Sequence, residues 1–218
     1  MHPMQFRCMN KGRFVTFEGG EGTGKSTQLR LLASHLSRSG IEFLQTREPG
    51  GSPSAEEIRS LLVTGSVNRW SPIAETLLFY AARVEHWRQV IEPALAKGAH
   101  VICDRFSDST IAYQAYAGGM NKATIQHLHN LVLPGVEPDL TFVLDLPIEI
   151  GLQRASARRD SETRFERKGK EFHERLRQGF LDIAKECPIR CVVIDATQTM
   201  EKVHSDILAV LQAKLKLS

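Results

Sequence analysis

Gly19-Gly20-Glu21-Gly22-Thr23-Gly24-Lys25-Ser26 is the stretch that decides the fold of this chain. It matches G-x-x-x-x-G-K-[ST], the pattern of the phosphate-binding P-loop. The apolar run 14–17 before it is typical of a buried strand, and the leucines at 29, 32 and 36 after it share one face of a predicted helix. Because a P-loop needs a strand, a glycine loop and a helix in this order, the sequence predicts that architecture.

The chemistry of this loop depends on glycine, lysine and serine at these spacings. Glycine lacks the Cβ atom that would keep backbone N–H groups away from phosphate oxygens, and the N-terminus of the following helix adds positive charge there. Lys25 can then reach the β- and γ-phosphates of a nucleoside triphosphate, and the hydroxyl of Ser26 can bind Mg²⁺. The alternative is an ordinary glycine-rich turn with an exposed lysine.

Composition favours a single globular domain. The chain has 218 residues, of which 42% are hydrophobic, and we expect the domain over 13–218 after an extension over 1–12 that lacks the apolar segment of a secretory signal. No run approaches the roughly 18 apolar residues of a membrane span, and a net charge of +3 demands no nucleic-acid partner. The four cysteines form no C-x-x-C pair, which favours buried thiols in a reducing, cytoplasmic compartment.

Short apolar runs alternate with helical segments along the whole chain. The expected strands are 14–17, 41–44, 101–103, 140–144 and 191–194. The expected helices are 25–39, 54–62, 72–97, 109–117, 122–131, 147–157, 169–185 and 200–215. Continuous apolar character marks strands that are covered on both faces. The sequence therefore predicts an α/β fold, a doubly wound five-stranded parallel sheet flanked by helices.

Charged and turn-forming residues follow these strands, where a doubly wound sheet binds its ligands. They are Thr46-Arg47-Glu48-Pro49-Gly50-Gly51, Asp104-Arg105-Phe106, Asp145 and Asp195-Ala196-Thr197. At a strand end, Asp104 can approach the Mg²⁺ shell, and the guanidinium of Arg105 can bind a second phosphate group. Ordinary strand-end salt bridges are the alternative, and they are the more common explanation for Asp145 or Asp195 alone.

Two further segments carry possible chemistry. Phe79 and Arg83 stand four residues apart on one helix face, so a ring that stacks on a base would lie beside a guanidinium that bonds its carbonyls. The arginine-rich stretch 154–167 is either a solvated loop or a mobile lid, expected over about 158–167, that brings cations to a phosphoryl group. A phosphoryl-transfer site excludes water, which favours the lid.

The resemblance to a known family rests on several of these segments in their order along the chain. They are Phe17-Glu18-Gly19, the P-loop, the Arg-Glu-Pro-Gly-Gly stretch 47–51, Phe79-Tyr80-Ala81-Ala82-Arg83, Asp104-Arg105-Phe106, Ala112-Tyr113-Gln114, Pro138-Asp139-Leu140-Thr141, the arginine-rich stretch and Ile194-Asp195-Ala196-Thr197. From about residue 13 to the C-terminus, the chain resembles bacterial thymidylate kinases with lid arginines.

The resemblance implies phosphorylation of dTMP to dTDP with ATP and Mg²⁺ in dTTP biosynthesis, by a homodimer. ATP would be bound by Gly19, Gly20, Glu21, Gly22, Thr23, Gly24, Lys25, Ser26, Thr27, Asp195, Ala196 and Thr197, with Ser26 and Asp104 on the metal. One subgroup carries an arginine in the P-loop where this chain has Thr23 or Gly22. Lid arginines would then supply that cation, so the implied catalytic residues are Lys25, Glu21, Arg105, Arg158 and Arg164, with Arg159 also available.

The same resemblance implies a set of contacts to dTMP. Phe79 would stack on thymine, Arg83 would bond its exocyclic oxygen, and Gln114 would meet the remaining polar edge of the base. Tyr113 would lie near the sugar, with Arg59 and Arg105 on the monophosphate. Arg47, Glu48, Pro49 and Ser109 (or Thr110) complete the implied substrate site.

Three other functions remain open at this point. A kinase for dUMP, dCMP or AMP would share the fold, although a guanidinium only donates and suits a carbonyl better than the amino group of cytosine. A P-loop switch or sensor protein is less favoured, because the guanine-binding pattern Asn-Lys-x-Asp is absent from the sequence. A nucleic-acid motor module is disfavoured by the near-neutral charge. The helix expected over 72–97 is apolar around much of its circumference, which is typical of a helix that is either buried or shared with a partner chain.

Overall fold

A computed structural model describes residues 12–157 and 164–217. Its sheet has five parallel strands in the order β2-β3-β1-β4-β5. The strands are β1 (Phe14–Glu18), β2 (Phe43–Arg47), β3 (His100–Asp104), β4 (Leu140–Asp145) and β5 (Cys191–Asp195). In the central strand, Thr16 stands opposite Cys103 on one side and Thr141 on the other. This parallel sheet confirms the predicted α/β fold and places the P-loop at the middle of its carboxyl edge.

Helices connect these strands and cover both faces of the sheet. They are α1 (Lys25–Arg38), α2 (Pro53–Val63), α3 (Pro72–His86), η1 (Trp87–Ile91), α4 (Glu92–Ala96), α5 (Ser107–Thr110), η2 (Ile111–Ala117), α6 (Lys122–Val132), α7 (Ile148–Ser156), α8 (Lys170–Glu186) and α9 (Met200–Leu215). Side chains cap several of them: Asn121 accepts from the N–H of Ala123 at the start of α6. None of the helices in the described ranges is long and apolar enough to cross a membrane.

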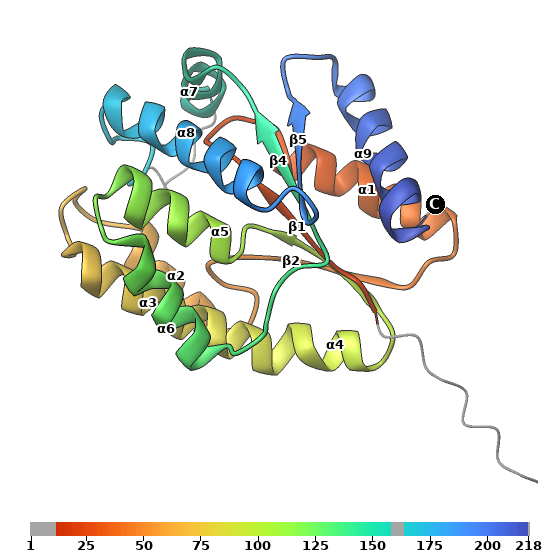
Figure 1. Cartoon of the computed structure of the whole chain (residues 1–218), viewed down its shortest axis with the longest axis horizontal. Coiled ribbons are helices and arrows are strands. Elements are labelled where there is room, and N and C mark those ends of the chain that lie inside the picture. Colours follow the sequence, from red (N-terminus) through yellow and green to blue (C-terminus); the bar gives the residue numbers. More distant parts are fainter. Residues whose placement is uncertain (1–11, 158–163, 218) are drawn as a thin grey trace, which may run out of the picture.

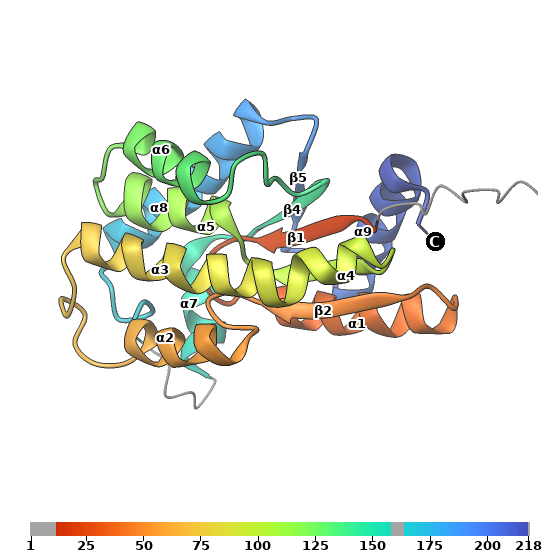
Figure 2. The ribbon, with the colours of Figure 1, turned by 90° about the horizontal axis from the view of Figure 1, so that it is seen from below.

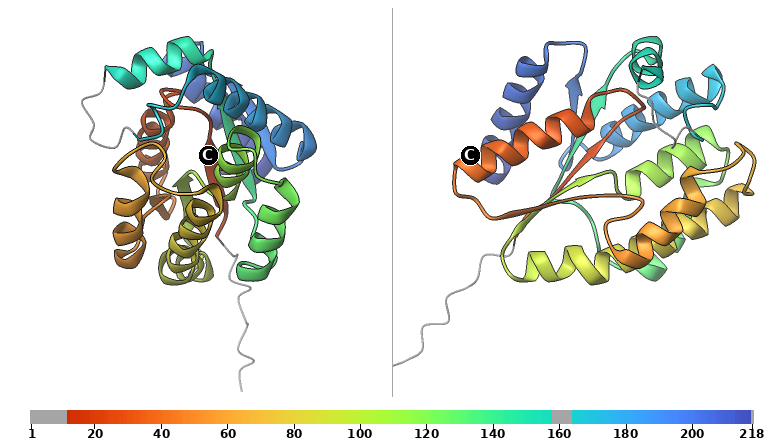
Figure 3. Two further views of the ribbon diagram at one scale, coloured as in Figure 1. Left: turned by 90° about the vertical axis from the view of Figure 1, so that its left-hand side faces the viewer. Right: turned by 180° about the vertical axis from the view of Figure 1, so that it is seen from behind.

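The core has two sides because the strands alternate their side chains. Val15 and Phe17 of β1 pack with the leucines of α1 and the apolar face of α9, which lie together on one face of the sheet (Figures 1 and 3). Phe14 points to the opposite face and packs with η1 and α4. On that same face, Val143 packs with η2 and α8. Figure 2 shows α2 running beside α3, with which it packs.

The structure differs from the sequence prediction in two places that matter for the site. The second strand runs over Phe43–Arg47 rather than 41–44, and it is half exposed because it forms an edge of the sheet. The helix expected over 109–117 begins at Ser107 and continues as the π-helix η2, with a second π-helical stretch, η1, inside 72–97. Single π-turns are frequent at functional sites, and Tyr113 and Gln114 lie on η2.

Candidate active site

Two adjoining cavities open at the carboxyl ends of β1, β2 and β3. The deep cavity has a volume of about 290 Å³, and the P-loop cavity has a volume of about 170 Å³. Both are lined by Glu21, Ser26, Arg47, Glu48, Arg59, Asp104 and Arg105. The sharing of these residues makes the cavities two halves of one site, with the P-loop on one side and α3 and η2 on the other.

The P-loop is held in place by close backbone packing. A Cβ atom on Gly22 would lie 2.0 Å from the carbonyl oxygen of Gly151 in α7, and Gly22 also has a φ of +68°. Gly24 has a φ of +91° and stands at the N-terminus of α1. Both positions require glycine because side chains rarely adopt such φ values. The loop is therefore fixed between α1 and α7, and its residues from Gly22 to Ser26 line the P-loop cavity.

Lys25 lies inside the curl of this loop. Its ammonium donates to the carbonyl oxygens of Gly19 and Gly20, at 3.1 and 2.8 Å, and only 8% of the residue is exposed. Burial, helped by the nearby charge of Arg105, lowers the pKa of Lys25 to about 8. An anion in the P-loop cavity would reverse this shift, because opposite charge favours the protonated ammonium.

Ser26 and Asp104 bring oxygen atoms together at the floor of the site. The Ser26 hydroxyl donates to Oδ2 of Asp104 at 3.2 Å. The other carboxylate oxygen, Oδ1, is buried and accepts no hydrogen bond from any residue that the structure describes. A hydroxyl and an under-used carboxylate are hard oxygen donors of the kind that Mg²⁺ prefers. These two residues therefore fit a magnesium ion between the strand end and the P-loop.

Arg105 is the second cation beside the P-loop. Its guanidinium donates to the Gly19 carbonyl at 2.9 Å and pairs with Glu21 at 3.2 Å, while the Tyr113 hydroxyl donates to the same Glu21 oxygen at 2.6 Å. Burial alone would lower the pKa of Arg105, but Tyr113 and Glu21 raise it above its ordinary value. The guanidinium is thus permanently charged and held where both cavities meet.

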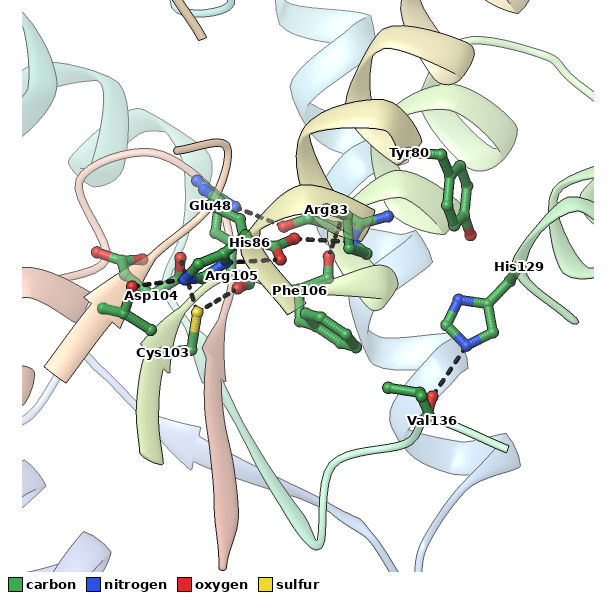
Figure 4. A network of polar contacts seen from close by, with 12 residues as sticks. Glu48, Tyr80, Arg83, His86, Cys103, Asp104, Arg105, Phe106, His129 and Val136 are labelled. Atoms are coloured by element: carbon green, nitrogen blue, oxygen red, sulfur yellow. Dashed lines mark hydrogen bonds and ion pairs between the residues drawn. The ribbon is translucent and has the colours of Figure 1, made fainter. Parts of the chain in front are cut away.

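Arg83 lies at the wall of the deep cavity in a buried network. Its Nε donates to Glu48 at 2.7 Å, and its Nη2 donates to the carbonyl of Phe106 at 3.1 Å. The ring of His86 hydrogen-bonds the second oxygen of Glu48 at 3.1 Å and Thr46 at 2.7 Å, which fixes the carboxylate (Figure 4). The remaining nitrogen, Nη1, is buried and has no hydrogen-bond partner among the described residues.

Gln114 lines the same cavity from η2. Its Nε2 donates to Glu75 at 2.8 Å, and its Oε1 is buried without a hydrogen-bond partner in the described part of the chain. Arg83 and Gln114 both line the deep cavity, and each has one buried side-chain atom without a partner among the described residues, a donor on Arg83 and an acceptor on Gln114. Buried polar atoms are nearly always paired, so this combination points to a ligand that offers an acceptor beside a donor.

An aromatic wall completes the deep cavity. Phe79 lines it from α3, and its ring centroid is 6.1 Å from that of Phe165, which also lines the cavity. The rings of Phe165 and Tyr113 meet edge to face, 5.5 Å apart. A flat ligand ring that lies against Phe79 in this cavity would be stacked on one face and hydrogen-bonded at its edge.

The structure brings most of the predicted site residues together. Gly22, Thr23, Gly24 and Thr27 line the P-loop cavity, and Pro49, Arg59 and Ser109 line the deep cavity. Gly19 and Gly20 begin the P-loop and accept from Lys25 through their carbonyl oxygens. Asp195, Ala196 and Thr197 lie at the end of β5 and line neither cavity. Arg158 and Arg159 fall outside the described residues.

Arg164 is not at the P-loop, where a catalytic lid arginine was expected. Only 1% of it is exposed, and its guanidinium donates to the backbone carbonyls of Leu62, Ser66 and Val67. These acceptors, together with Glu75, hold the charge away from both cavities.

Sequence reasoning missed several buried residues around the site. Glu75 precedes Phe79 and Arg83 at four-residue spacing on one helix, a signal that could have placed it beside them. Glu18 accepts from the N–H of Phe106 and the hydroxyl of Ser109, and burial, with Asp108 nearby, raises its pKa to about 7. Its position at the end of β1, just before the P-loop, was the available clue.

Comparison with known proteins identifies one family over nearly the whole chain. The family model of thymidylate kinase matches residues 17–207. A thymidylate kinase of Caulobacter vibrioides is 54% identical over 209 residues, which are 96% of this chain and 100% of that protein. One from Dinoroseobacter shibae is 53% identical over 91% of this chain and 95% of its own length. The crystal structure of thymidylate kinase from Ehrlichia chaffeensis superposes with a TM-score of 0.74 at 39% identity, covering 93% of this chain and 99% of that one.

Proposed function

This chain belongs to the thymidylate kinase family, and from that premise we propose how its residues divide the work between the two cavities. The enzyme is an ATP- and Mg²⁺-dependent nucleoside monophosphate kinase that phosphorylates dTMP in nucleotide biosynthesis. In our assignment, the P-loop cavity binds the ATP phosphates, and the deep cavity binds dTMP. The residues that the cavities share lie where the phosphoryl group is transferred.

On the phosphate side, the P-loop amides and Lys25 bind the β- and γ-phosphates. Ser26 and Asp104 would hold Mg²⁺, for which their oxygens are suited. The ion would supply positive charge that neutralises the nucleotide phosphates. Arg105, together with Arg59, binds the phosphate of dTMP from the point where the cavities meet. Arg158 remains a predicted catalytic cation.

On the base side, Phe79 stacks on thymine while Arg83 and Gln114 read its edge. Thymine presents a carbonyl oxygen at position 4, an acceptor, next to the N3–H donor. Arg83 Nη1 is an unused donor and Gln114 Oε1 is an unused acceptor, so the pair complements that edge. This complementarity is the single observation that carries the assignment of the base. Tyr113 lies at the sugar end with Glu21, to which it donates.

The reaction needs positioning and charge neutralisation more than proton transfer. The attacking oxygen of dTMP is already anionic at neutral pH, so no strong general base is required. Lys25 and Arg105 neutralise charge on the two sides of the phosphoryl group, and Arg105 stays charged at any working pH. Glu21 restrains Arg105 through their ion pair and thereby positions the guanidinium that binds the acceptor phosphate.

The assignment is tested by kinetics of variants on the base side. We expect Arg83→Ala and Gln114→Ala to raise the KM for dTMP by about 10²-fold and about 10-fold, because a lost hydrogen bond leaves its partner unpaired. The KM for ATP should change less than about 2-fold, since both residues lie outside the P-loop cavity. Arg38→Ala, exposed at the C-terminal end of α1 and outside both cavities, is the matched control. Equal increases of both KM values would contradict the assignment.

We also propose that two copies of the chain form a dimer through α3 and α6. Ile73 and Leu77 are about half exposed on one face of α3, and Leu131 is 79% exposed on α6, with which α3 packs. A row of large apolar side chains is costly to leave in water. Leu77→Glu should convert the dimer to a monomer in light scattering, and a wild-type monomer at micromolar concentration would refute the dimer.

A cytoplasmic location is proposed from the cysteines. Cys103 and Cys191 are buried, as predicted, and both are free thiols, as is Cys187. Free thiols persist in reducing compartments. Fractionation of the cells that express the protein, with a marker for each compartment, tests this location.

A further inference from the structure

Arg164 connects a late segment of the chain to the loop between α2 and α3. Its Nε donates to Ser66 at 3.0 Å, its Nη1 to Leu62 at 3.1 Å and its Nη2 to Val67 at 3.1 Å, all through backbone carbonyls. Nη1 also pairs with Oε2 of Glu75 at 2.5 Å. A fully buried guanidinium with four acceptors is strongly restrained, so it fixes the carboxylate that it faces.

Glu75 passes this restraint to the base site. Oε2 of the carboxylate is paired with Arg164, and Oε1 accepts from the Nε2 of Gln114 at 2.8 Å. A carboxylate only accepts hydrogen bonds, so the amide of Gln114 must present its NH₂ group to Glu75. The carbonyl oxygen of Gln114 is then the atom that remains for the deep cavity, where it lacks a partner among the described residues.

We propose that Arg164 is a positioning residue for base recognition, acting through Glu75 to set the orientation of the Gln114 amide. The inference rests on the proposed contact between Gln114 and the N3–H of thymine. With the amide reversed, an NH₂ group would face that N3–H, and a carbonyl would face the carboxylate of Glu75. Both contacts would place like partial charges together, so the ion pair behind Gln114 selects the acceptor that thymine needs.

A neighbouring contact supports the placement. Phe165 follows Arg164 directly, lines the deep cavity, and packs edge to face on Tyr113 at a centroid distance of 5.5 Å. The anchoring of Arg164 therefore positions one aromatic wall of the base site as well as one of its hydrogen-bonding groups.

The test is a double-mutant cycle between Glu75→Gln and Gln114→Ala, measured as the KM for dTMP. Glu75→Gln keeps the shape of the side chain but removes the charge that fixes the amide, so we expect the KM for dTMP to rise about tenfold. In the Gln114→Ala background the same change should raise it less than about twofold, because the group that Glu75 orients is gone. Arg164→Lys, which keeps the charge but loses the planar fork, should behave as Glu75→Gln does.

Glu48→Gln is the matched control, because Glu48 is the other buried carboxylate of the site but pairs with Arg83 instead of Gln114. Its effect should multiply with that of Gln114→Ala. Thermal unfolding of each variant separates folding from function, and Glu75→Gln carries the test if Arg164→Lys does not fold.

The outcomes distinguish the proposed relay, the chain of contacts from Arg164 through Glu75 to Gln114, from the base contact on which it rests. If Gln114→Ala leaves the KM for dTMP unchanged, the proposed contact to the base is wrong and the relay falls with it. If Gln114→Ala raises that KM, but Glu75→Gln multiplies the increase in full, Arg164 and Glu75 only stabilise the fold. That result would overturn the relay and leave the base contact standing.

Discussion

The phosphate half and the base half of this site are built in different ways. In the phosphate half, Lys25 donates to carbonyls five and six residues away in the P-loop, and Asp104 and Arg105 join it from the end of another strand. In the base half, Arg83 pairs with Glu48, 35 residues away, and Gln114 pairs with Glu75, 39 residues away. The phosphate half binds phosphate groups, as every P-loop protein does. The base half depends on buried pairs whose members come from distant parts of the chain.

The comparison separates catalytic power from substrate choice. Backbone amides and one ammonium bind phosphate without regard to the attached nucleoside. Selection between nucleosides requires a donor and an acceptor held at fixed positions, and buried pairs such as Glu48 with Arg83 supply that restraint. Damage to the first half should therefore reduce turnover for any acceptor, and damage to the second should change which acceptor is used.

The largest effect is expected from Lys25→Ala. Loss of the ammonium removes the charge that faces the transferring phosphoryl group, and kcat should fall about 10³-fold. Lys202→Ala, on the exposed face of α9, is the control. The measurement is ADP release in a coupled assay, with circular dichroism to confirm that the variant folds. A kcat within a few-fold of the wild-type value would show that the P-loop is not the phosphoryl-transfer site.

The pH dependence of nucleotide affinity should differ between the two halves. Phosphate favours the charged form of Lys25, whose pKa is about 8 in the ligand-free protein. Above pH 8 the ammonium must first regain its proton, so the affinity for ATP should fall up to about tenfold per pH unit. Calorimetry at pH 7 to 9 should also detect proton uptake when ATP binds.

The affinity for dTMP is the internal comparison in the same pH series. The pKa of Arg83 is raised by Glu48 in spite of its burial, so the base half should stay charged throughout this range. Parallel loss of affinity for ATP and dTMP would mean that Lys25 does not determine the difference between the halves.

The smallest effect concerns Glu18, which joins the halves through Phe106 and Ser109. Burial raises its pKa to about 7 from an ordinary value of 4.5, so the native state binds more protons than the unfolded state between these values. The free energy of unfolding should therefore fall as pH rises through this window, by about 1–3 kcal/mol from this residue. Chemical denaturation at pH 5 and pH 8 should show a smaller fall in Glu18→Gln. A pH dependence in Glu18→Gln equal to that of the wild type would contradict the raised pKa of Glu18.

The contrast also explains what could be predicted from the sequence. Local patterns predicted the P-loop and the five strands, because adjacent residues define each of them. Asp104 could be predicted as a neighbour of Ser26 because it ends a strand beside the P-loop. The strand order needed the folded chain. The placement of Arg164 also needed the folded chain, because its partner Ser66 is 98 positions away. A charged segment such as the one around Arg164 is usually exposed, so its burial could not be predicted from the sequence. The four-residue spacing singled out Arg83 with Phe79, and the family resemblance added Gln114, but the unpaired atoms of Arg83 and Gln114 appeared only in three dimensions.

The central claim is that Arg83 and Gln114 together read a carbonyl beside an N–H group. Comparing kcat/KM for dTMP, dUMP and dCMP with ATP and Mg²⁺ tests it most directly. Cytosine presents an amino group to Arg83 and an acceptor to Gln114, so dCMP should be at least about 10²-fold poorer than dTMP, with dUMP between them. Use of dCMP within a few-fold of dTMP would contradict this account of the base half.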